Sequence, residues 1–540
     1  MSKITDSRSI LKKTNDETIN VALDTLSIGK QAIIFVNTKR SAESIAEKIS
    51  KQLEISKDNS LSKKILSVLS HPTKQCKRLA DIIDKGIAFH HSGLLAEQRR
   101  IVEENFKNGK IKLIVATPTL AIGLDLPAFR VIIRDLKRYG LWGMEYIPVL
   151  EYHQQAGRAG RPSYDNYGEA IIIANDEKQK KELIDRYING EPEDIISKLA
   201  SEPILRTYIL SIISSEFVRS DKELKDFFNK TFYAYQYGDL KKLNIIINKI
   251  IEQLQEWLFL KDIEKIKNDN SEDFVSALKI SLKENKQDNK IEATPLGKRV
   301  SELYLDPYTA YMLIENMKII DNIISSKITI KKFSELTLIN VFCNCLELRP
   351  LLRVKTSEYD EIKEYLNINE EYIITEPEEY DDTDFFNAIK TSKVFMDWLD
   401  EKDEEYILEK YDVRPGEFYG KLEIMDWIIY SCIEISRILK FREITKELTK
   451  LRIRLKYGVK EELLPLLKLK NIGRVRARML FKNGIKDIAD VKKVEFSNLS
   501  KILGTNIAID VKRQVGQEFS EEKIKVKENK RKGQISLNDY

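Results

Sequence analysis

Two arginines lie three residues apart in the stretch HQQAGRAGRP, at Arg158 and Arg161. Gly157 and Gly160 precede them, and Gln154 lies about one helical turn before the first arginine. Guanidinium groups bind phosphates through several N–H donors at once, and glycine lets a phosphate approach the backbone closely. The stretch therefore predicts a site for phosphate groups.

Hydroxyl, glycine and charged residues also follow two short apolar runs, IIFV and LIVA. In open α/β sheets, ligands bind beyond the carboxyl ends of the strands. We therefore expect these loops and the arginine stretch to converge on one site. The loop residues are Lys39, Arg40, Thr117, Thr119, Gly123 and Asp125.

The first third of the chain alternates buried-strand patterns with helical ones. QAIIFV, GIAFHH, KLIVAT, RVIIRDL and EAIIIA are short apolar runs rich in β-branched residues, and AEQRRIVEENFK has helical spacing with a glycine stop at Gly109. Residues 1–188 are therefore expected to form an α/β domain with a mostly parallel sheet.

From residue 189 onward, long Leu/Ile-periodic stretches favour helices. Residues 189–292 suit a winged helix-turn-helix, although a plain helical hairpin fits the same pattern. Residues 293–450 are expected to be a helical domain with an acidic loop, ITEPEEYDDTDFF. The predicted fold class is therefore multidomain α/β plus all-α.

Residues 451–513 contain two short helical patterns joined by NIGRVRA. A glycine before a helix exposes backbone N–H groups to a phosphate, and Arg474, Arg476 and Arg478 add positive charge. The pattern resembles a helix-hairpin-helix element that binds the DNA backbone, and an ordinary helical hairpin with a basic surface is the alternative.

Residues 514–540 are rich in Lys and Glu and are expected to be disordered. At their end, Gln534, Leu537 and Tyr540 place a glutamine ahead of apolar and aromatic residues, which resembles a motif that binds the sliding clamp. The usual second aromatic residue is missing, and a frayed terminus fits equally well.

The composition of the chain argues against several kinds of site and segment. The 90 Lys and Arg residues against 85 Asp and Glu residues give a net charge of only +5, so a DNA-binding surface would depend on local clustering. The four cysteines and four histidines show no zinc-site spacing, and no metal site is predicted. No signal peptide or long apolar run is seen, which favours a cytoplasmic protein.

The stretches FVNTKRSAE, HHSGL, ATPTLAIGLDLPAFRVIIRD and QQAGRAGRP resemble motifs IV, IVa, V and VI of superfamily 2 helicases. Together with TFYAYQ, TPLGKRVSELYLDP, LRPLLR and KNIGRVRARMLF, they resemble the archaeal Holliday-junction-migration (Hjm) helicase family of the Ski two-like branch over nearly the whole chain. This resemblance implies a second RecA-like domain, a winged helix, a helical ratchet domain and a helix-hairpin-helix domain.

The resemblance implies that Arg158 and Arg161 are arginine fingers on ATP and that Gln154 contacts the nucleotide or the facing motifs. It also implies that Gly123, Asp125, Gly157 and Gly160 couple the ATP cleft to DNA. A strand-separating hairpin is expected near residues 137–149, and a ratchet helix carries Trp427, with Lys421 or Tyr419 where the family has arginine. Arg349 and Arg353 either face the same channel or form internal ion pairs. The DNA-binding residues implied are Thr38, Lys39, Arg40, His91, Thr117, Thr119, Tyr139, Trp142, Lys421, Trp427, Arg474, Arg476 and Arg478.

The sequence departs from the family's pattern at one point. It has no GxxxxGK[ST] phosphate loop and no acidic box, and SIGKQ at residues 27–31 is the nearest approach. The departure suggests a chain without the first RecA-like domain: the C-terminal subunit of a split, ATP-dependent 3′–5′ helicase acting in replication-fork repair and recombination, inactive alone. ATP and Mg²⁺ would then be bound mainly by a separate partner chain. The alternatives are a non-catalytic, clamp-linked DNA-binding adaptor and a fragment of a longer helicase.

Overall fold

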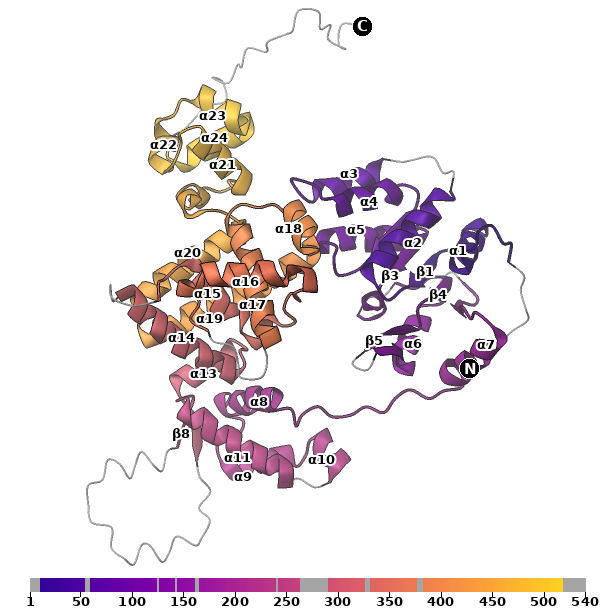
Figure 1. The fold of residues 1–540 in the computed structure, drawn as a ribbon, viewed down its shortest axis with the longest axis horizontal. Helices are drawn as coiled ribbons and strands as arrows, with labels where there is room; N and C mark the ends of the chain where they lie inside the picture. Colours follow the sequence, from indigo (N-terminus) through magenta and orange to yellow (C-terminus); the bar gives the residue numbers. More distant parts are fainter. Residues whose placement is uncertain are drawn as a thin grey trace, which may run out of the picture. The chain divides into compact units, whose positions relative to one another are not determined.

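The protein was analysed as a computed structural model that describes residues 10–53, 59–123, 126–140, 143–160, 165–238, 241–262, 290–325, 331–375 and 382–517. The chain divides into two compact units (Figure 1). The first comprises Met1–Tyr311 with Asp403–Met425, and the second comprises Met312–Lys402 with Asp426–Tyr540. The predicted mixture of an α/β part with a parallel sheet and many helices is confirmed. The finer assignment of separate domains stays a prediction.

The first unit contains a five-stranded, fully parallel sheet in the order β2-β3-β1-β4-β7. Four of the strands are buried along their whole length, as continuous Ile, Val and Leu runs require in a sheet covered on both faces. The strands are β1 (Ala32–Phe35), β2 (Ile87–His90), β3 (Leu113–Ala116), β4 (Arg130–Ile133) and β7 (Glu169–Ile172).

Helices cover this sheet and bury their apolar stripes in one core with the strands. Helix α2, for example, places Ala42, Ile45, Ala46 and Ile49 in that core. Figure 1 shows α1 and α2 beside the strands. The helices of this part are α1 (Glu17–Ser27), α2 (Lys39–Lys51), α3 (Ser60–Ser67), α4 (Lys74–Ile83), α5 (Ala96–Lys107), α6 (Val149–Ala156) and α7 (Glu177–Leu183).

The SIGKQ stretch is the turn between α1 and β1. Gly29 has a φ of +72°, a left-handed conformation that ends a helix. Lys30 Nζ lies 2.7 Å from Asp165 Oδ1. A phosphate loop runs from a strand into a helix, whereas this turn runs from a helix into a strand. It is therefore not a phosphate loop.

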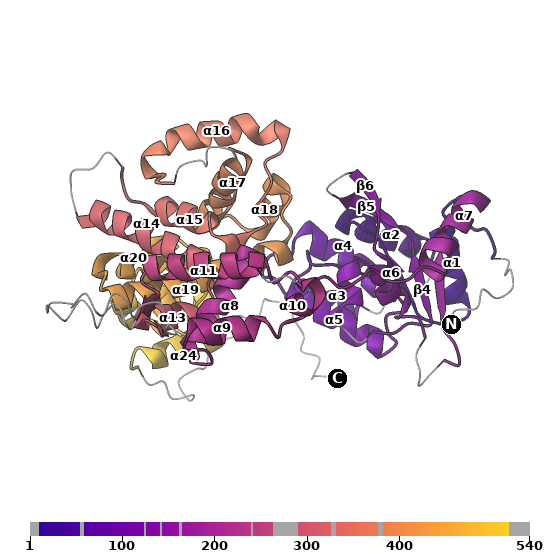
Figure 2. The same ribbon diagram turned by 90° about the horizontal axis from the view of Figure 1, so that it is seen from below.

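Strand β4 leads into an antiparallel hairpin of β5 (Lys137–Gly140) and β6 (Gly143–Tyr146). Every residue of β5 is exposed, and Figure 2 shows the hairpin standing out from the α/β part. A hairpin thus lies within the predicted range of residues 137–149, and its role in strand separation stays a prediction.

The rest of the first unit is mainly helical. A two-stranded antiparallel sheet accompanies its helices, and Arg206 and Asp306 form a buried ion pair with a 2.9 Å contact. These elements are compatible with a winged helix, and the winged-helix assignment stays a prediction. The elements are α8 (Glu202–Ser214), α9 (Asp221–Phe228), α10 (Phe232–Tyr237), α11 (Lys241–Glu256), β8 (Leu260–Asp262), β9 (Ile291–Ala293), α13 (Pro295–Glu302) and α18 (Glu404–Tyr411).

The second unit is helical throughout its described residues. Helices α14 (Pro307–Ser325) and α19 (Pro415–Leu439) begin in the first unit and continue into the second. A separate apolar core gathers the last four helices. The other helices are α15 (Glu335–Cys343), α16 (Tyr359–Ile368), α17 (Asp382–Leu399), α20 (Arg442–Tyr457), α21 (Arg474–Lys482), α22 (Ile488–Lys493), α23 (Phe496–Leu503) and α24 (Thr505–Gln514).

Two further properties concern the described residues only. None of their helices combines the length and apolar character needed to cross a bilayer. They also contain no group of three His, Cys, Asp or Glu side chains placed to hold a metal ion.

Candidate functional site

Arg158 is fixed by the loop that follows β3. Its Nε donates a 3.1 Å hydrogen bond to the carbonyl oxygen of Ala121, and its Nη2 contacts the same oxygen. Its own carbonyl accepts from the Ala128 amide at 2.9 Å, and the Gly160 amide donates to the Ala128 carbonyl at 2.7 Å. No carboxylate of the described residues pairs with Arg158, so its charge is not neutralised within this part of the protein.

The expected convergence of the three loops stays a prediction, although the Arg158 side chain contacts the loop after β3 at Ala121. Ala128, which bonds Arg158 and Gly160, precedes β4 and so lies toward the amino end of that strand. Thr117, in contrast, directly follows the carboxyl end of β3. Arg158 itself follows helix α6 rather than a strand. Its backbone is therefore tied to Ala128, while its side chain contacts Ala121 in the loop after β3.

The structure describes only some of the residues that were predicted to face the nucleotide near Arg158. Gln154 is exposed on α6, one helical turn before Arg158. Gly123 has a φ of +76°, and a Cβ at this position would meet no neighbour within 4 Å, so the backbone there is open. Gly157 caps the end of α6. Arg161 and Asp125 lie outside the described residues.

Hydroxyl groups gather at the carboxyl edge of the sheet. Thr117 is nearly buried while Thr119 is exposed, and their hydroxyl oxygens lie 3.0 Å apart. Thr38 caps the start of α2 by accepting a hydrogen bond from the Ser41 amide. A cap of this kind leaves the first-turn N–H groups of α2 directed toward the same edge.

The cations predicted to bind DNA at this edge have partners inside the first unit. Lys39 forms an ion pair with Glu417, and Arg40 Nη2 lies 2.7 Å from Asp412 Oδ2. His91 is fully buried, and its Nε2 lies 3.2 Å from Glu43 Oε1. Burial lowers the pKa of His91, which keeps the ring neutral.

The root of the hairpin is tied to the loop after β1. The Asn37 amide donates a 3.0 Å hydrogen bond to Asp135 Oδ2, and Asn37 Nδ2 donates to the Lys137 carbonyl. Lys137 Nζ lies 4.3 Å from the centroid of the Tyr146 ring. These contacts hold the hairpin's base, while Tyr139 on β5 is 84% exposed.

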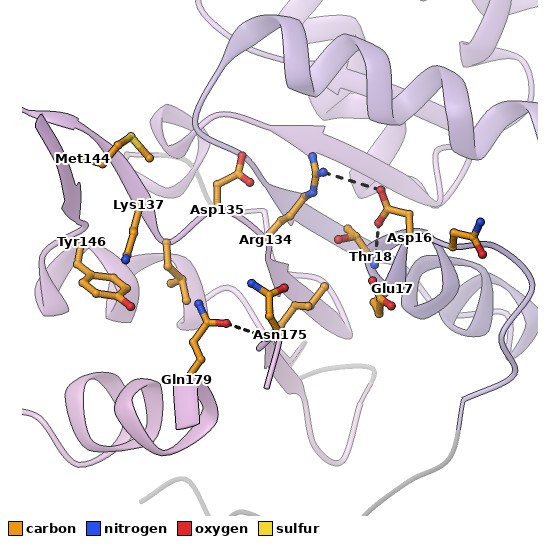
Figure 3. A pocket seen from close by; sticks show the side chains of 13 residues that line it. Asp16, Glu17, Thr18, Arg134, Asp135, Lys137, Met144, Tyr146, Asn175 and Gln179 are labelled. Atoms are coloured by element: carbon orange, nitrogen blue, oxygen red, sulfur yellow. Dashed lines mark hydrogen bonds and ion pairs between the residues drawn. The ribbon is translucent and has the colours of Figure 1, made fainter. Parts of the chain in front are cut away.

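A cavity of about 510 Å³ lies beside the hairpin root (Figure 3). In that view, Arg134 points toward Asp16, and their contact is 3.8 Å between Nη2 and Oδ2. The sequence prediction missed this cavity, although the RD pair directly after the RVII strand marks charged residues at the carboxyl edge. The lining residues are Asn15, Asp16, Glu17, Thr18, Arg134, Asp135, Leu136, Lys137, Met144, Tyr146, Ile173, Asn175 and Gln179.

On helix α19, the predicted ratchet residues are half-buried. Lys421 and Trp427 each keep part of their surface exposed. The Tyr419 hydroxyl donates a 2.8 Å hydrogen bond to Glu404 Oε1, so Tyr419 is engaged within the protein. Elsewhere, Arg349 pairs with Asp384, as the internal alternative expected, whereas Arg353 is exposed.

The three arginines of the last helical part differ in their surroundings. Arg478 contacts Glu401 and Glu462, and the hydrogen bond to Glu401 contributes most to raising its pKa. Arg474 lies over the Trp398 ring at 4.7 Å. Arg476 is exposed, with one donor bonded to the Asn471 carbonyl. Of the remaining predicted residues, Trp142, Gln534, Leu537 and Tyr540 lie outside the described residues.

Two family models match the chain. The model of the helicase conserved C-terminal domain matches residues 59–163, which include α3 to α6 and the hairpin. The model of archaeal helicase domain 4 matches residues 336–458, which belong to the second unit except for Asp403–Met425 of the first.

Several curated proteins are similar over most of the chain. The ATP-dependent DNA helicase Hel308 of Methanococcus vannielii is 39% identical over 510 residues, or 90% of this chain and 65% of its own length. Hel308 of Methanocella arvoryzae is 35% identical over 95% of this chain and 66% of its length. Hel308 of Pyrococcus horikoshii is 36% identical over 95% of this chain and 67% of its length. The chain thus spans about two thirds of each relative.

These relatives overturn the expectation of a split helicase. Each is a single polypeptide that carries both the region matched here and the remaining third. The prediction that this region is the C-terminal subunit of a helicase shared between two chains is therefore wrong. A partner chain carrying the other RecA-like domain is likewise not supported.

Proposed function

Because the chain belongs to the Hel308 family of archaeal DNA helicases, we propose that it takes part in ATP-dependent movement along DNA and separation of the strands. The observation that carries the proposal is that Arg158 is held by the Ala121 carbonyl and pairs with no carboxylate of the described residues, while the backbone at Gly123, two residues after Ala121, is open. A cation fixed by a carbonyl retains its charge for an external anion.

The residues around Arg158 fit the triphosphate of ATP. Nε and Nη2 of Arg158 contact Ala121, which leaves the Nη1 donors for a phosphate oxygen. Gln154 offers an exposed amide on the same helical turn. ATP would supply the phosphoanhydride bond whose cleavage drives the cycle. The described residues offer no cluster of ligands for Mg²⁺, so we assign none to it.

The carboxyl edge of the sheet is the proposed contact for the DNA backbone. Thr119 is exposed beside the nearly buried Thr117, and the start of α2 presents backbone N–H groups after Thr38. Hydroxyls and helix N-termini contact phosphates without reading sequence, so binding to this edge should be independent of base identity. Exposed Arg476 is the proposed second contact, in the helix-hairpin-helix part.

The hairpin is the proposed element for strand separation. Tyr139 is almost fully exposed on a hairpin whose base is fixed by Asn37 and Asp135. An aromatic ring held in this way can stack on the last base pair of a duplex. The half-buried Trp427 on α19 is the proposed stacking residue for the single strand. The 3′–5′ direction and clamp binding by the tail remain predictions.

Binding of fluorescently labelled DNA to the purified chain tests the proposal. We expect single-stranded DNA of mixed sequence to bind with an affinity that falls steeply with salt. Thr119→Val should weaken binding of all sequences about equally, whereas Thr207→Val, at a half-buried position on α8, should leave it unchanged. A chain that binds no DNA at low salt would refute the proposal.

A further inference from the structure

A cavity of about 390 Å³ lies within the second unit, where a loop meets the starts of α16 and α17. Val354, Tyr359 and Phe386 line part of it. The ring centroids of Tyr359 and Phe386 are 5.0 Å apart, and Tyr359 is 43% exposed. Val354 and Phe386 pack against a small apolar core, which fixes this wall. A cavity of this size and lining can hold one small planar molecule.

Three polar side chains on one face of α17 hold the loop in place. Asn387 Oδ1 accepts a 2.8 Å hydrogen bond from the Val354 amide, and Thr391 Oγ1 accepts a 3.1 Å hydrogen bond from the Leu352 amide. Lys390 Nζ donates a 2.9 Å hydrogen bond to the carbonyl of the residue between them. All three side chains are buried. The loop is therefore bound to the helix along its backbone, and the cavity has a preformed wall.

Asn387 also brings an unused donor to the cavity, which it lines while being only 8% exposed. Its Oδ1 is occupied by the Val354 amide, and among the described residues its Nδ2 has no hydrogen-bond acceptor. A side-chain amide nitrogen carries two N–H donors, and a buried donor without a partner is unfavourable. A ligand with an acceptor at the edge of a planar ring would satisfy this donor.

The surface beside the cavity carries exposed cations. Arg353 and Lys355 lie on either side of Val354, and both are exposed. Glu358, the carboxylate next to Tyr359 in the sequence, is paired with the buried Lys390 at 2.6 Å, which reduces its repulsion of an anion. A planar ring in the cavity and a phosphate outside it would both find complementary groups, and a nucleotide combines the two.

We propose that this cavity binds one base of single-stranded DNA. We call Val354, Tyr359, Phe386 and Asn387 the α16–α17 pocket. The base stacks on the Tyr359 ring and accepts a hydrogen bond from Asn387 Nδ2 through a carbonyl oxygen, which thymine, cytosine and guanine have and adenine lacks. The inference rests on the proposed function and adds to it a base-holding site on α16 and α17, apart from Trp427 on α19.

Fluorine NMR of the nucleoside 5-fluoro-2′-deoxyuridine tests the pocket without a phosphate. The full chain should broaden the fluorine signal. Tyr359→Ala should weaken nucleoside binding on the order of 10-fold, because the stacking surface is lost. Asn387→Asp keeps an oxygen for the Val354 amide but loses the donor, and should weaken binding about 5-fold. Tyr359→Phe keeps the ring and should bind normally, as should Tyr304→Ala, at an 80% exposed tyrosine of the first unit.

Light-induced cross-linking tests the same pocket with DNA. Single-stranded DNA that carries 5-iodouracil should form a cross-link to Tyr359 or Phe386, identified by mass spectrometry of the digested chain. The proposal stands only if this cross-link forms and nucleoside binding falls in Tyr359→Ala and Asn387→Asp. Cross-links confined to other residues, or nucleoside binding that is absent or unchanged in both variants, overturn it.

Two further outcomes keep the test decisive. If Asn387→Asp fails to fold by circular dichroism, Tyr359→Ala decides, because the Tyr359 side chain is partly exposed and its loss leaves the hydrogen bonds of the loop intact. If the unmodified chain binds no single-stranded DNA, the proposed function fails, and the nucleoside result alone decides whether the pocket holds a base.

Discussion

Arg158 donates the hydrogen bond from its Nε to the carbonyl oxygen of Ala121, 3.1 Å away, and not to a carboxylate. This hydrogen bond links the arginine of the GRAGRP stretch to the loop that follows β3 and begins with Thr117. If a nucleotide binds at Arg158 and DNA binds at Thr117, as proposed, this hydrogen bond would couple the two sites through the backbone between Thr117 and Ala121.

Replacing Arg158 with alanine should weaken binding of a fluorescent ATP analogue. The loss of charge-assisted hydrogen bonds to a phosphate costs about 1.5–3 kcal/mol, which is roughly a 10- to 100-fold rise in Kd. Equilibrium titration of the purified chain measures this. Arg100→Ala serves as the control, because Arg100 lies on α5 and pairs with Glu97 and Glu104. An Arg158 variant that binds the analogue normally would remove Arg158 from the ATP site.

Glu43 should make stability depend on pH in the acid range. Burial alone would raise its pKa, but the His91 contact and the charges of Arg414 and Arg78 outweigh burial and lower the pKa to about 2. The ordinary value is 4.5. A lowered carboxyl pKa stabilises the fold above pH 4.5, and this contribution, on the order of 3 kcal/mol, is lost as pH falls from 4.5 toward 2.

The measurement is urea unfolding at pH 7 and at pH 3, for the unmodified chain and for Glu43→Gln. The difference in unfolding free energy between the two proteins should be large at pH 7 and should shrink at pH 3. Glu97→Gln, at an exposed pair, provides the comparison. A difference that stays constant with pH would show that Glu43 does not titrate in this range.

Gly458 should tolerate no side chain. Its φ is +64°, and a Cβ would overlap the indole ring of Trp398, whose Nε1 donates a 2.8 Å hydrogen bond to the Leu455 carbonyl. Gly458→Ala should therefore destabilise the second unit by more than the roughly 1 kcal/mol expected from a left-handed alanine alone. Gly484→Ala isolates that backbone term, since Gly484 has a φ of +81° and no neighbour within 4 Å of a Cβ. Equal melting temperatures for the two variants would contradict the packing argument.

Tyr139 should matter for forked DNA and not for single strands. If its ring stacks on the last base pair, Tyr139→Ala loses about 1–3 kcal/mol of affinity for a fork, while affinity for a plain single strand is unchanged. Fluorescence of a base analogue placed at the junction reports the stacking directly. Tyr235→Ala, at another highly exposed tyrosine on α10, should leave the junction signal as it is. An equal loss of affinity for both DNAs would show that Tyr139 contacts the single strand and does not stack on the last base pair.

Much of the sheet could be predicted from the sequence, because buried parallel strands appear as continuous apolar runs. LIVA and RVII form β3 and β4 as expected, and Thr117 follows β3 at the carboxyl edge. The position of Arg158 could not be predicted by the same rule, since it follows a helix whose direction the local pattern does not specify.

The sequence patterns also could not predict ion pairs between residues that are far apart in the chain. Glu43 and Arg414 are 371 residues apart, and neither lies in a stretch whose spacing marks the other. Lys39 and Arg40 carry the charge of a DNA site, yet their carboxylate partners come from residues 412–417. Charge identifies a residue that needs an anion, but not whether that anion is a phosphate or a carboxylate of the same protein.

The most direct test of the proposed function is the affinity of the purified chain for labelled single-stranded DNA across a range of salt concentrations. The surfaces described predict binding of mixed-sequence DNA whose logarithm of affinity falls linearly with the logarithm of salt, and a uniform loss in Thr119→Val. No binding at low salt, or binding that does not respond to salt, would contradict the proposal that this chain holds the DNA backbone.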